Sequence, residues 1–439
     1  MNLTPKEIVK FLDDYVIGQK NAKKVIAIAL RNRYRRMQLS KELQDDITPK
    51  NILMIGSTGV GKTEIARRLS KMLGLPFVKV EASKYTEVGF VGRDVESMVR
   101  DLANAALSLV KREQREKNKD KIDEFIENKI LEKLLPPLPK GVSDEKQEEY
   151  KNSLAKMRTR LKNGDLDESM IEIEIAQSMF DTNPNLPPEM GAMQDIVKVI
   201  GVGSKKVKKE MKIKDAKNAL KSEASEKILD MESIKSEALR RAENEGIIFI
   251  DEIDKVAVAS GNSNRQDPSK EGVQRDLLPI VEGSSVQTKI GTLKTDYILF
   301  IAAGAFHLSK PSDLIPELQG RFPLRVELDS LDDEALYQIL TQPKNSLLKQ
   351  YKELLATEKL ELKFDDEAVR EIARIASVAN AEMQDIGARR LHTIIEKLLE
   401  DLSFEADGFA NKEFVVDKAM VEDKLKGIIE NKDLARYIL

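Results

Sequence analysis

The chain has 439 residues, too many for one ordinary hydrophobic core, so we expect two or three domains. Its 33% charged and 5% aromatic residues are typical of a helix-rich protein with solvated faces, and the net charge of −3 gives no indication of nucleic-acid binding. The lack of cysteine excludes disulfides, thiolate metal sites and a cysteine nucleophile. Residues 1–9 have no apolar signal core, and no run approaches the roughly 20 apolar residues that cross a bilayer. We therefore expect a cytoplasmic protein without membrane contact.

Strand and helix patterns alternate along much of the chain. Residues 1–48 are predicted to be helical, with Thr4 as the N-cap and Pro5 at the first helical position. Short apolar runs predict strands at 51–55, 76–80, 247–250 and 297–301, and helical periodicity predicts helices at 62–73, at 95–112 and almost throughout after 331. This alternation predicts a parallel sheet covered on both faces.

Residues from about 111 to 240 differ in character, because they are highly charged and are interrupted by prolines. Amphipathic helical stretches lie between the interruptions. Basic runs such as 205–214 are mixed with acidic or apolar residues, so we interpret them as solvated faces.

The strongest motif is Gly56-Ser57-Thr58-Gly59-Val60-Gly61-Lys62-Thr63, which has the spacing of a phosphate-binding P-loop. Glycines let backbone N–H groups turn inward around phosphates, and the following helix points its N-terminus at the same anions. Lys62 would place a positive charge on the β- and γ-phosphates of ATP, and the Thr63 hydroxyl would ligate Mg²⁺. A glycine turn with a solvated lysine is the alternative, and the flanking strand and helix disfavour it.

A second motif is the apolar strand Ile247-Ile248-Phe249-Ile250 followed by Asp251 and Glu252. Ligand chemistry gathers at the carboxyl ends of parallel strands. Asp251 could hold Mg²⁺ through water, and Glu252 could polarise the water that attacks the γ-phosphate. An apolar strand followed by two acids is weak by itself, but a P-loop in the same chain strengthens the interpretation.

Together the P-loop and Asp251-Glu252-Ile253-Asp254 resemble an AAA+ ATPase. Within AAA+ the chain closely resembles, from Ile8 to Leu439, the unfoldases that serve the bacterial HslV peptidase. The resemblance implies an α/β fold with a P-loop parallel-sheet core at 1–104 and 241–330, a helical inserted domain at 105–240 and a C-terminal helical domain at 331–439. It also implies a homo-hexameric ring that acts on unfolded or degradation-targeted proteins.

The resemblance assigns further site residues. Ile17, in Ile17-Gly18-Gln19, would lie against the adenine, and Arg389, in Gly387-Ala388-Arg389, would reach the phosphates. Arg321 would be an arginine finger offered to the neighbouring subunit, with Glu317 shortly before it. The sensor strand ends without the usual polar residue, so we assign no role there. The whole expected nucleotide-binding set is Ile17, Gly59, Val60, Gly61, Lys62, Thr63, Glu64, Asp251, Glu317 and Arg389.

Two segments are candidates for contacts with other proteins. Gly89-Phe90-Val91-Gly92 could be a partly buried aromatic turn or a mobile loop with an apolar tip, and the resemblance favours a pore loop that grips polypeptide. The terminal Tyr437, Ile438 and Leu439 could fold back on their own helical domain or insert into a partner pocket. The resemblance favours insertion into the peptidase.

The two histidines, His307 and His392, have no metal-ligand spacing around them, so core or surface roles are expected. We therefore expect an ATP-dependent unfoldase. A nucleic-acid motor on the same core is the rival, disfavoured by the balanced charge and the lack of a helix-turn-helix pattern. A scaffold without catalysis conflicts with the intact set of Lys62, Asp251 and Glu252.

Overall fold

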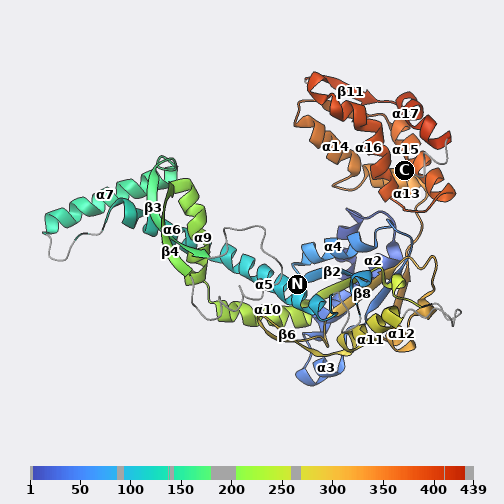
Figure 1. Cartoon of the computed structure of the whole chain (residues 1–439), viewed down its shortest axis with the longest axis horizontal. Helices are drawn as coiled ribbons and strands as arrows, with labels where there is room; N and C mark the ends of the chain where they lie inside the picture. The colour runs from blue at the N-terminus through green and yellow to red at the C-terminus, as the bar shows by residue number, and fades with distance from the viewer. Residues whose placement is uncertain are drawn as a thin grey trace. The chain divides into compact units, whose positions relative to one another are not determined.

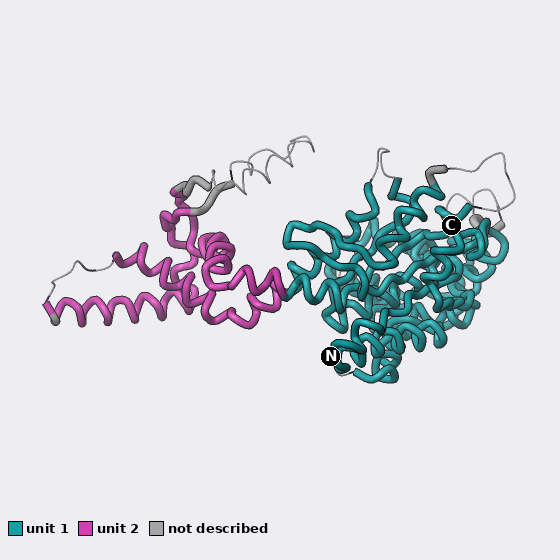
Figure 2. The backbone as a smooth tube through the Cα atoms, turned by 90° about the horizontal axis from the view of Figure 1, so that it is seen from below, with its two compact units in different colours: residues 1–109, 237–439 teal, residues 110–236 magenta. Residues whose placement is uncertain are grey.

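The computed structural model describes residues 3–86, 93–136, 138, 143–178, 204–258, 268–409 and 411–430. The chain forms two compact units, which Figure 2 distinguishes by colour: unit 1 comprises residues 1–109 and 237–439, and unit 2 comprises residues 110–236. None of the helices within the described ranges has the length and apolarity that a membrane crossing requires.

Unit 1 begins with three helices, where the sequence predicted one helical region. They are α1 (Pro5–Asp13), α2 (Lys20–Arg36) and α3 (Lys41–Asp46). Thr4 is confirmed as the N-cap of α1: its hydroxyl accepts from the Glu7 amide while the Glu7 carboxylate accepts from the Thr4 amide. The helical prediction fails between α1 and α2 because Gly18 and Gln19 both adopt left-handed backbone angles, which end a helix.

A five-stranded sheet forms the centre of unit 1 (Figure 1). Its strands are β1 (Ile52–Ile55), β2 (Phe77–Glu81), β5 (Ile247–Asp251), β8 (Leu299–Gly304) and β9 (Leu324–Glu327). Their order is β2-β5-β8-β1-β9, and every neighbouring pair is parallel, which confirms the predicted sheet type. The carboxyl ends of all five strands therefore meet at one edge.

Alternation along the strands shows that both faces of this sheet are covered. Ile247 and Phe249 of β5 pack in one apolar cluster with residues of α1, α2 and the helix α4 (Lys62–Leu73). Ile248 and Ile250 point to the opposite face and are equally buried. Strands buried on both faces read as continuous apolar runs, which is why β5 was recognisable in the sequence.

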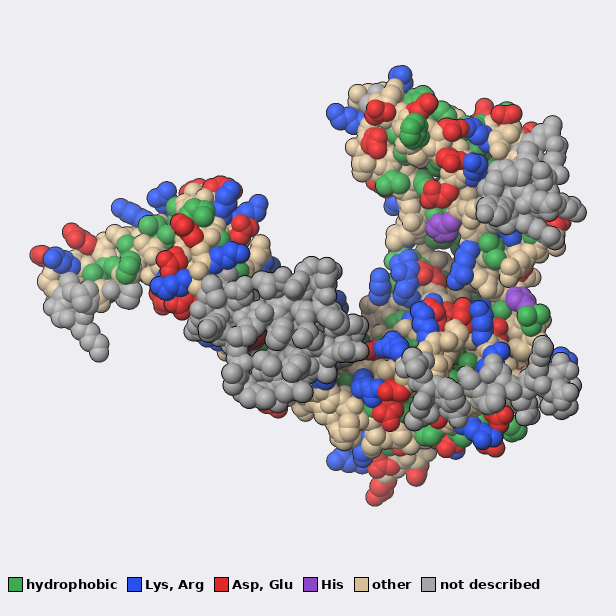
Figure 3. Space-filling model, viewed as in Figure 1, with side chains coloured by type: hydrophobic (Ala, Val, Ile, Leu, Met, Phe, Trp, Pro, Cys, Tyr) green, Lys and Arg blue, Asp and Glu red, His purple; other side chains and the backbone are tan. Residues whose placement is uncertain are grey.

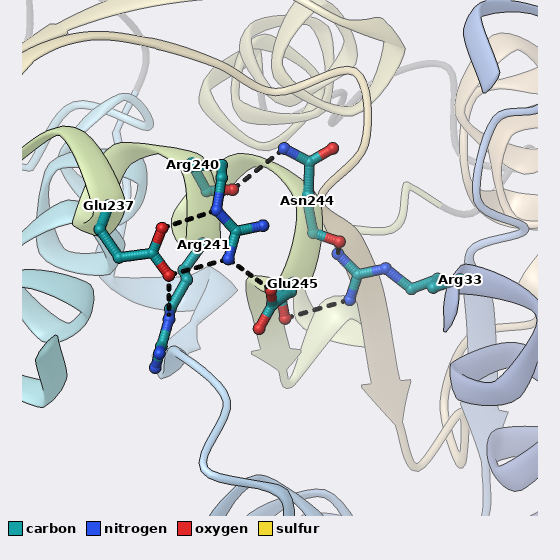
Figure 4. A network of polar contacts seen from close by, with 6 residues as sticks. All are labelled: Arg33, Glu237, Arg240, Arg241, Asn244 and Glu245. Carbon is teal, nitrogen blue, oxygen red and sulfur yellow. Dashed lines mark hydrogen bonds and ion pairs between the residues drawn. The ribbon is translucent and has the colours of Figure 1, made fainter. Parts of the chain in front are cut away.

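A buried arginine fixes the point at which the chain enters β5 (Figure 4). The helix α10 (Met231–Glu245) ends two residues before this strand, and its last carbonyls need donors. The Arg33 guanidinium donates to the backbone carbonyls of Asn244 at 2.8 Å, Glu245 at 3.2 Å and Tyr297 at 2.8 Å. Burial lowers the pKa of Arg33 to about 9, so the group is still a cation at neutral pH.

Further helices and a hairpin complete the part of unit 1 that adjoins the sheet. They are α5 (Ser97–Lys117), which extends into unit 2, α11 (Pro268–Glu282), α12 (Pro316–Arg321), and the strands β6 (Ser285–Thr288) and β7 (Gly291–Lys294).

From Leu331 onward the chain has a hydrophobic cluster of its own. Its helices are α13 (Asp333–Thr341), α14 (Leu347–Ala356), α15 (Asp366–Glu382), α16 (Arg389–Phe404) and α17 (Lys418–Glu430). The helical prediction missed a parallel pair of four-residue strands, β10 (Glu361–Phe364) and β11 (Glu413–Val416). Strands this short alternate too briefly to stand out from helical periodicity.

Unit 2 packs its helices around an antiparallel hairpin. Its elements are α6 (Lys119–Leu134), α7 (Asp144–Asn163), β3 (Met170–Ser178), β4 (Ser204–Lys212) and α9 (Ile213–Ile228). Much of the basic run predicted as a solvated face lies on β4. The ammonium of Lys208 there pairs with Glu172 across the hairpin at 3.1 Å, and both side chains remain exposed.

Candidate functional site

The glycine loop turns sharply between β1 and α4. Gly59 and Gly61 adopt φ angles of 80° and 103°, which residues with a side chain rarely occupy, and Gly61 is the N-cap of α4. The Lys62 ammonium points back into the loop and donates to the carbonyls of Gly56 and, at 2.7 Å, Ser57. Burial lowers the pKa of Lys62, while Asp251 nearby opposes the shift. A cation is therefore held inside a turn of backbone at a helix N-terminus.

The two acidic residues at the end of β5 lie directly opposite this loop. The Thr63 hydroxyl donates to Asp251 Oδ2 at 3.1 Å, although the two residues are far apart in the sequence. Glu252 leaves the strand with a left-handed φ of 59°, a strained backbone angle of the kind that clusters at functional sites. The structure thus brings Lys62, Thr63, Asp251 and Glu252 together in one place.

Two further residues touch these acids and were not predicted. The Lys79 ammonium lies 2.9 Å from Asp251 Oδ2, and the Ser83 hydroxyl donates to Glu252 Oε2 at 3.0 Å. Both follow from the pairing of β2 with β5, in which Glu81 is the neighbour of Asp251. No sequence motif marks them, because their positions depend on which strand lies beside β5.

The loop and the acidic pair open into a cavity of about 1370 Å³. Figure 3 shows Lys and Arg side chains gathered around a hollow on one face of unit 1. The predicted residues that line the cavity are Ile17, Gly59, Val60, Gly61, Lys62, Thr63, Glu64, Asp251, Glu252 and Arg389. His307 and His392 are exposed and line the same cavity, which their sequence separation gave no reason to expect.

Ile17 lies on the wall contributed by the segment between α1 and α2. The neighbouring Tyr15 ring has the Arg68 guanidinium 4.3 Å from its centroid, and Arg68 in turn pairs with Glu64 at 2.6 Å. The Lys344 ammonium lies 2.6 Å from Asp14, so this wall also contacts the helical segment after Leu331. An apolar and aromatic wall beside a cationic loop suits a ligand with a flat base and an anionic tail.

The turn that carries Arg389 into the cavity packs backbone against backbone on the glycine loop. The Ala388 amide donates to the Gly59 carbonyl at 3.3 Å. A methyl group added at Gly387 would lie 2.6 Å from the Thr58 carbonyl oxygen, and one added at Gly59 would lie 2.1 Å from the Ile386 carbonyl oxygen. Only glycine allows so close an approach, so the two glycines set the position of Arg389 at the start of α16.

Glu317 and Arg321 are not among the residues that line this cavity. Both lie exposed on α12, and the Arg321 guanidinium pairs with Glu282 at 2.8 Å. Gly89, Phe90, Val91 and Gly92, and Tyr437, Ile438 and Leu439, lie outside the described residues. Within the described ranges there is no group of three or more His, Asp or Glu side chains that could enclose a metal ion.

Comparisons with known proteins agree with this geometry. The model of the ATPase family associated with various cellular activities (AAA) matches residues 52–190, that of the AAA domain (Cdc48 subfamily) matches 164–325, and that of the C-terminal, D2-small domain of ClpB protein matches 331–406. The "ATP-dependent protease ATPase subunit HslU" of Campylobacter jejuni subsp. jejuni serotype O:2 is 89% identical over 439 residues, 100% of both chains. The Helicobacter pylori protein of the same description is 61% identical over 440 residues, covering 100% of this chain and 99% of its own.

The parallel sheet, the glycine loop with its facing acids, and the family matches define an AAA ATPase, an enzyme that binds and hydrolyses ATP. Within that class, the full-length identities show that the chain belongs to the HslU family of ATPase subunits of ATP-dependent proteases.

The contact between Gly59 and Gly387 predicts how a single methyl group would affect ATP binding. Gly387→Ala puts a side chain at φ 57° and against the Thr58 carbonyl, a strain of about 1–3 kcal/mol that moves the turn and Arg389. We expect the KM for ATP to rise roughly tenfold or more. Gly408→Ala, at a position with no atom within 4 Å, is the matched control and should leave KM unchanged. Equal KM values for the two variants would show that the contact does not position Arg389.

Proposed function

We propose that the chain is the ATP-driven unfoldase of a two-component protease. It assembles as a homo-hexameric ring in the cytoplasm, grips unfolded or degradation-targeted proteins and threads them into an HslV peptidase. The observation that carries this proposal is the convergence of Lys62, Thr63, Asp251 and Glu252 in one cavity of a chain 89% identical to an HslU. A motor that unfolds protein needs an intact hydrolytic site, and these four residues supply its chemical groups.

The glycine loop is proposed to hold the ATP phosphates. The backbone amides of Gly59, Val60 and Gly61 and the N-terminus of α4, which continues through Glu64, would face the anions. Lys62 lies within this turn, so its ammonium would move from the Gly56 and Ser57 carbonyls to the β- and γ-phosphates. An exchange of this kind replaces carbonyl partners with fully charged ones, which strengthens binding.

Thr63 and Asp251 are proposed to hold Mg²⁺ beside the phosphates. Their Oγ1 and Oδ2 atoms lie 3.1 Å apart, and oxygen donors in small number suit Mg²⁺, which keeps several of its waters. Bound there, the ion would neutralise charge on the β- and γ-oxygens. The Lys79 ammonium, 2.9 Å from Asp251 Oδ2, pairs with that carboxylate when the ion is absent.

Glu252 is proposed to accept a proton from the water that attacks the γ-phosphate in line with the leaving oxygen. The Ser83 hydroxyl donates to Glu252 Oε2, which leaves Oε1 for the water. Ile17 would pack against the adenine, and Arg389 would stabilise negative charge on the phosphates from the helical side.

Arg321 and Glu317 are proposed to act at the site of the neighbouring subunit. Arg321 is about half exposed and is not part of the cavity of its own chain, so its guanidinium, paired with Glu282, lies where a neighbouring subunit could receive it. A guanidinium that arrives from a neighbour would compensate the charge that develops on the γ-phosphate. Hydrolysis would then require assembly.

We also propose a division of the chain into three domains, with two segments that contact other proteins. Residues 1–104 and 241–330 form the nucleotide-binding core, 105–240 an inserted domain and 331–439 a helical domain; the separate hydrophobic clusters of the last two regions support this division. Gly89, Phe90, Val91 and Gly92 form the pore loop, and Tyr437, Ile438 and Leu439 dock on the peptidase. Burying each of the two aliphatic side chains of that tail could contribute about 1.5–3 kcal/mol.

Substitutions of Lys62 and Glu252 should affect different steps, ATP binding in the first case and hydrolysis in the second. Lys62→Ala removes a charge-assisted contact worth about 1.5–3 kcal/mol, which weakens ATP binding roughly 10- to 150-fold. Glu252→Gln preserves binding but removes the proton acceptor, so kcat should fall about 10²- to 10⁴-fold. Calorimetry of ATP binding together with steady-state ATPase rates measures both, and an equal loss of affinity in the two variants would contradict these roles.

The in-trans role of Arg321 predicts that ATPase activity depends on assembly. Activity per subunit should decline on dilution below the assembly threshold, and Arg321→Ala should lower kcat by about 10³-fold or more. Inactive Arg321→Ala subunits mixed with inactive Glu252→Gln subunits should regain part of the activity, because one interface in the mixed ring combines an intact finger with an intact Glu252. Turnover that does not change with dilution would refute the assignment.

Two changes should separate ATP hydrolysis from degradation at different steps. Phe90→Ala removes the aromatic grip, so ATPase activity and HslV cleavage of short peptides should persist while degradation of a folded protein stops. Deleting residues 436–439 should spare the ATPase but stop HslV activation against peptides and proteins alike. Phe90→Tyr, which keeps the ring, is the control and should be nearly neutral. Full peptidase activation by the truncated chain would remove the tail from the mechanism.

A further inference from the structure

A fully buried glutamine joins two segments that the proposed function places at different nucleotide sites. Gln274 lies on α11 with no exposed surface. Its side-chain amide donates to the Val256 carbonyl at 2.7 Å, and its side-chain carbonyl accepts from the Ile315 amide at 2.8 Å. Both ends of the carboxamide are therefore held by backbone groups of different segments.

The first segment starts at the hydrolytic site. Glu252 is followed immediately by the short 3₁₀ helix η2 (Ile253–Lys255), and Val256 comes directly after it. A shift of Glu252 on nucleotide binding or hydrolysis therefore reaches the Val256 carbonyl through a single turn of backbone.

The second segment leads to the proposed finger. Ile315 is the N-cap of α12, the helix that ends at Arg321. Two other hydrogen bonds join this segment to the first. The Ser309 hydroxyl donates to the Asp254 carbonyl at 3.2 Å. The Val258 amide donates to the Asp313 carbonyl at 3.1 Å. Neither of these contacts holds α12 itself.

The same helix α11 also holds the finger directly. Its last residue, Glu282, accepts from the Nε of Arg321 at 2.9 Å and lies 2.8 Å from the second guanidinium nitrogen. Gln274 therefore fixes the start of α12 and Glu282 fixes the arginine at its end.

A buried carboxamide with both ends bonded cannot turn without leaving a donor and an acceptor unsatisfied in a dry environment. Moving Val256 while Ile315 stays in place would break one of the two bonds, so the lower-energy response is that both segments and α11 move together. Hydrogen-bonded networks and rigid helices can carry coupling between two sites, and these contacts form such a network.

We propose that α11 ties the finger of each subunit to that subunit's own hydrolytic segment, with Gln274 as the positioning residue for α12 and Glu282 as the positioning residue for Arg321. The nucleotide site of one subunit thereby sets the placement of the arginine offered to its neighbour. The proposal rests on the in-trans role of Arg321.

The first measurement separates kcat from KM. Gln274→Leu and Gln274→Met remove both hydrogen bonds while keeping a side chain of similar size. Because the finger acts on hydrolysis at the neighbouring site and Gln274 is not among the residues that line the nucleotide cavity, kcat should fall roughly tenfold while the KM for ATP stays within about twofold. A rise in KM at constant kcat would overturn the proposal.

Mixed rings show at which site the glutamine acts. A Gln274→Leu subunit with a misplaced finger still has an intact hydrolytic site. Mixing it with Glu252→Gln subunits, whose fingers are intact, should restore activity, whereas mixing it with Arg321→Ala subunits should not. Restoration by Arg321→Ala subunits would mean that Gln274 serves its own site, and restoration by neither would mean general damage to the fold; either result overturns the proposal.

A second buried glutamine is the matched control. Gln19 makes the same pair of bonds to the backbone of one residue: its amide donates to the Asp329 carbonyl at 2.8 Å and its carbonyl accepts from the Asp329 amide at 2.9 Å. Gln19 lies two residues after Ile17, which lines the nucleotide cavity, so Gln19→Leu should damage the nucleotide site of the subunit that carries it. Activity should then be restored by mixing with Arg321→Ala subunits instead. The same mixing pattern for both glutamine variants would contradict the proposal.

A substitute variant and a reference mixture distinguish failure of this inference from other causes. If the Gln274 variants do not assemble, Glu282→Ala at the exposed end of α11 should still give restoration with Glu252→Gln subunits only, and failure to do so overturns the proposal. The reference mixture of Arg321→Ala with Glu252→Gln tests the in-trans role alone. Loss of restoration in that reference refutes the in-trans role of Arg321 in the proposed function, whereas restoration there with none for the α11 variants refutes only the present inference.

Discussion

Parallel pairing of the central strands is the constraint on which the chemistry of this protein depends. Because β1, β8 and β5 run in the same direction, the glycine loop that follows β1 and the acidic pair that ends β5 emerge at one edge of the sheet. A cation inside the loop then faces two carboxylates across a cavity, and Thr63 bonds to Asp251 directly. Opposite charges gathered at one edge make a polar site at the ends of the apolar strands β1, β5 and β8. The same edge receives Lys79 from β2 and Ser83 from the short 3₁₀ helix that follows β2, and these two residues contact the acids before any ligand arrives.

The cavity has a second wall because glycine permits a contact that no other residue would allow. Gly387 and Gly59 bring the backbone of the segment before α16 against the glycine loop, within reach of a hydrogen bond. A phosphate bound by the loop would therefore be felt by the helical segment through backbone contacts as well as through Arg389. A ligand shifts an equilibrium by no more than its differential affinity for the two states, and contacts with the loop that binds it are one source of such a difference.

The strand β5 is also held at both of its ends by buried side chains. The helix α10 begins in unit 2 and ends in unit 1, where its last carbonyls are bound by Arg33 just before β5. After β5, the chain continues through η2 to Val256 and the buried Gln274. The strand that carries Asp251 and Glu252 is thus bonded at its entry by one buried arginine and after its exit by one buried glutamine. Hydrogen bonds from these buried side chains to backbone carbonyls fix the segments that they join, which is what an ordered hydrolytic site requires.

Local patterns in the sequence were sufficient for the parts that depend on neighbouring residues. The bounds of α4 were predicted at Lys62–Leu73, and β5 was marked by its apolar run. The glycine loop and the two acids stood out by their spacing. Each of these features rests on backbone angles or burial that a few adjacent residues dictate. Only the tertiary structure decided the strand order, the short pair β10–β11, the break between α1 and α2, and the contacts of Lys79, Ser83, Gln274 and both histidines. Those contacts join residues from different elements, and their partners are chosen by packing of the whole chain rather than by any periodicity along it.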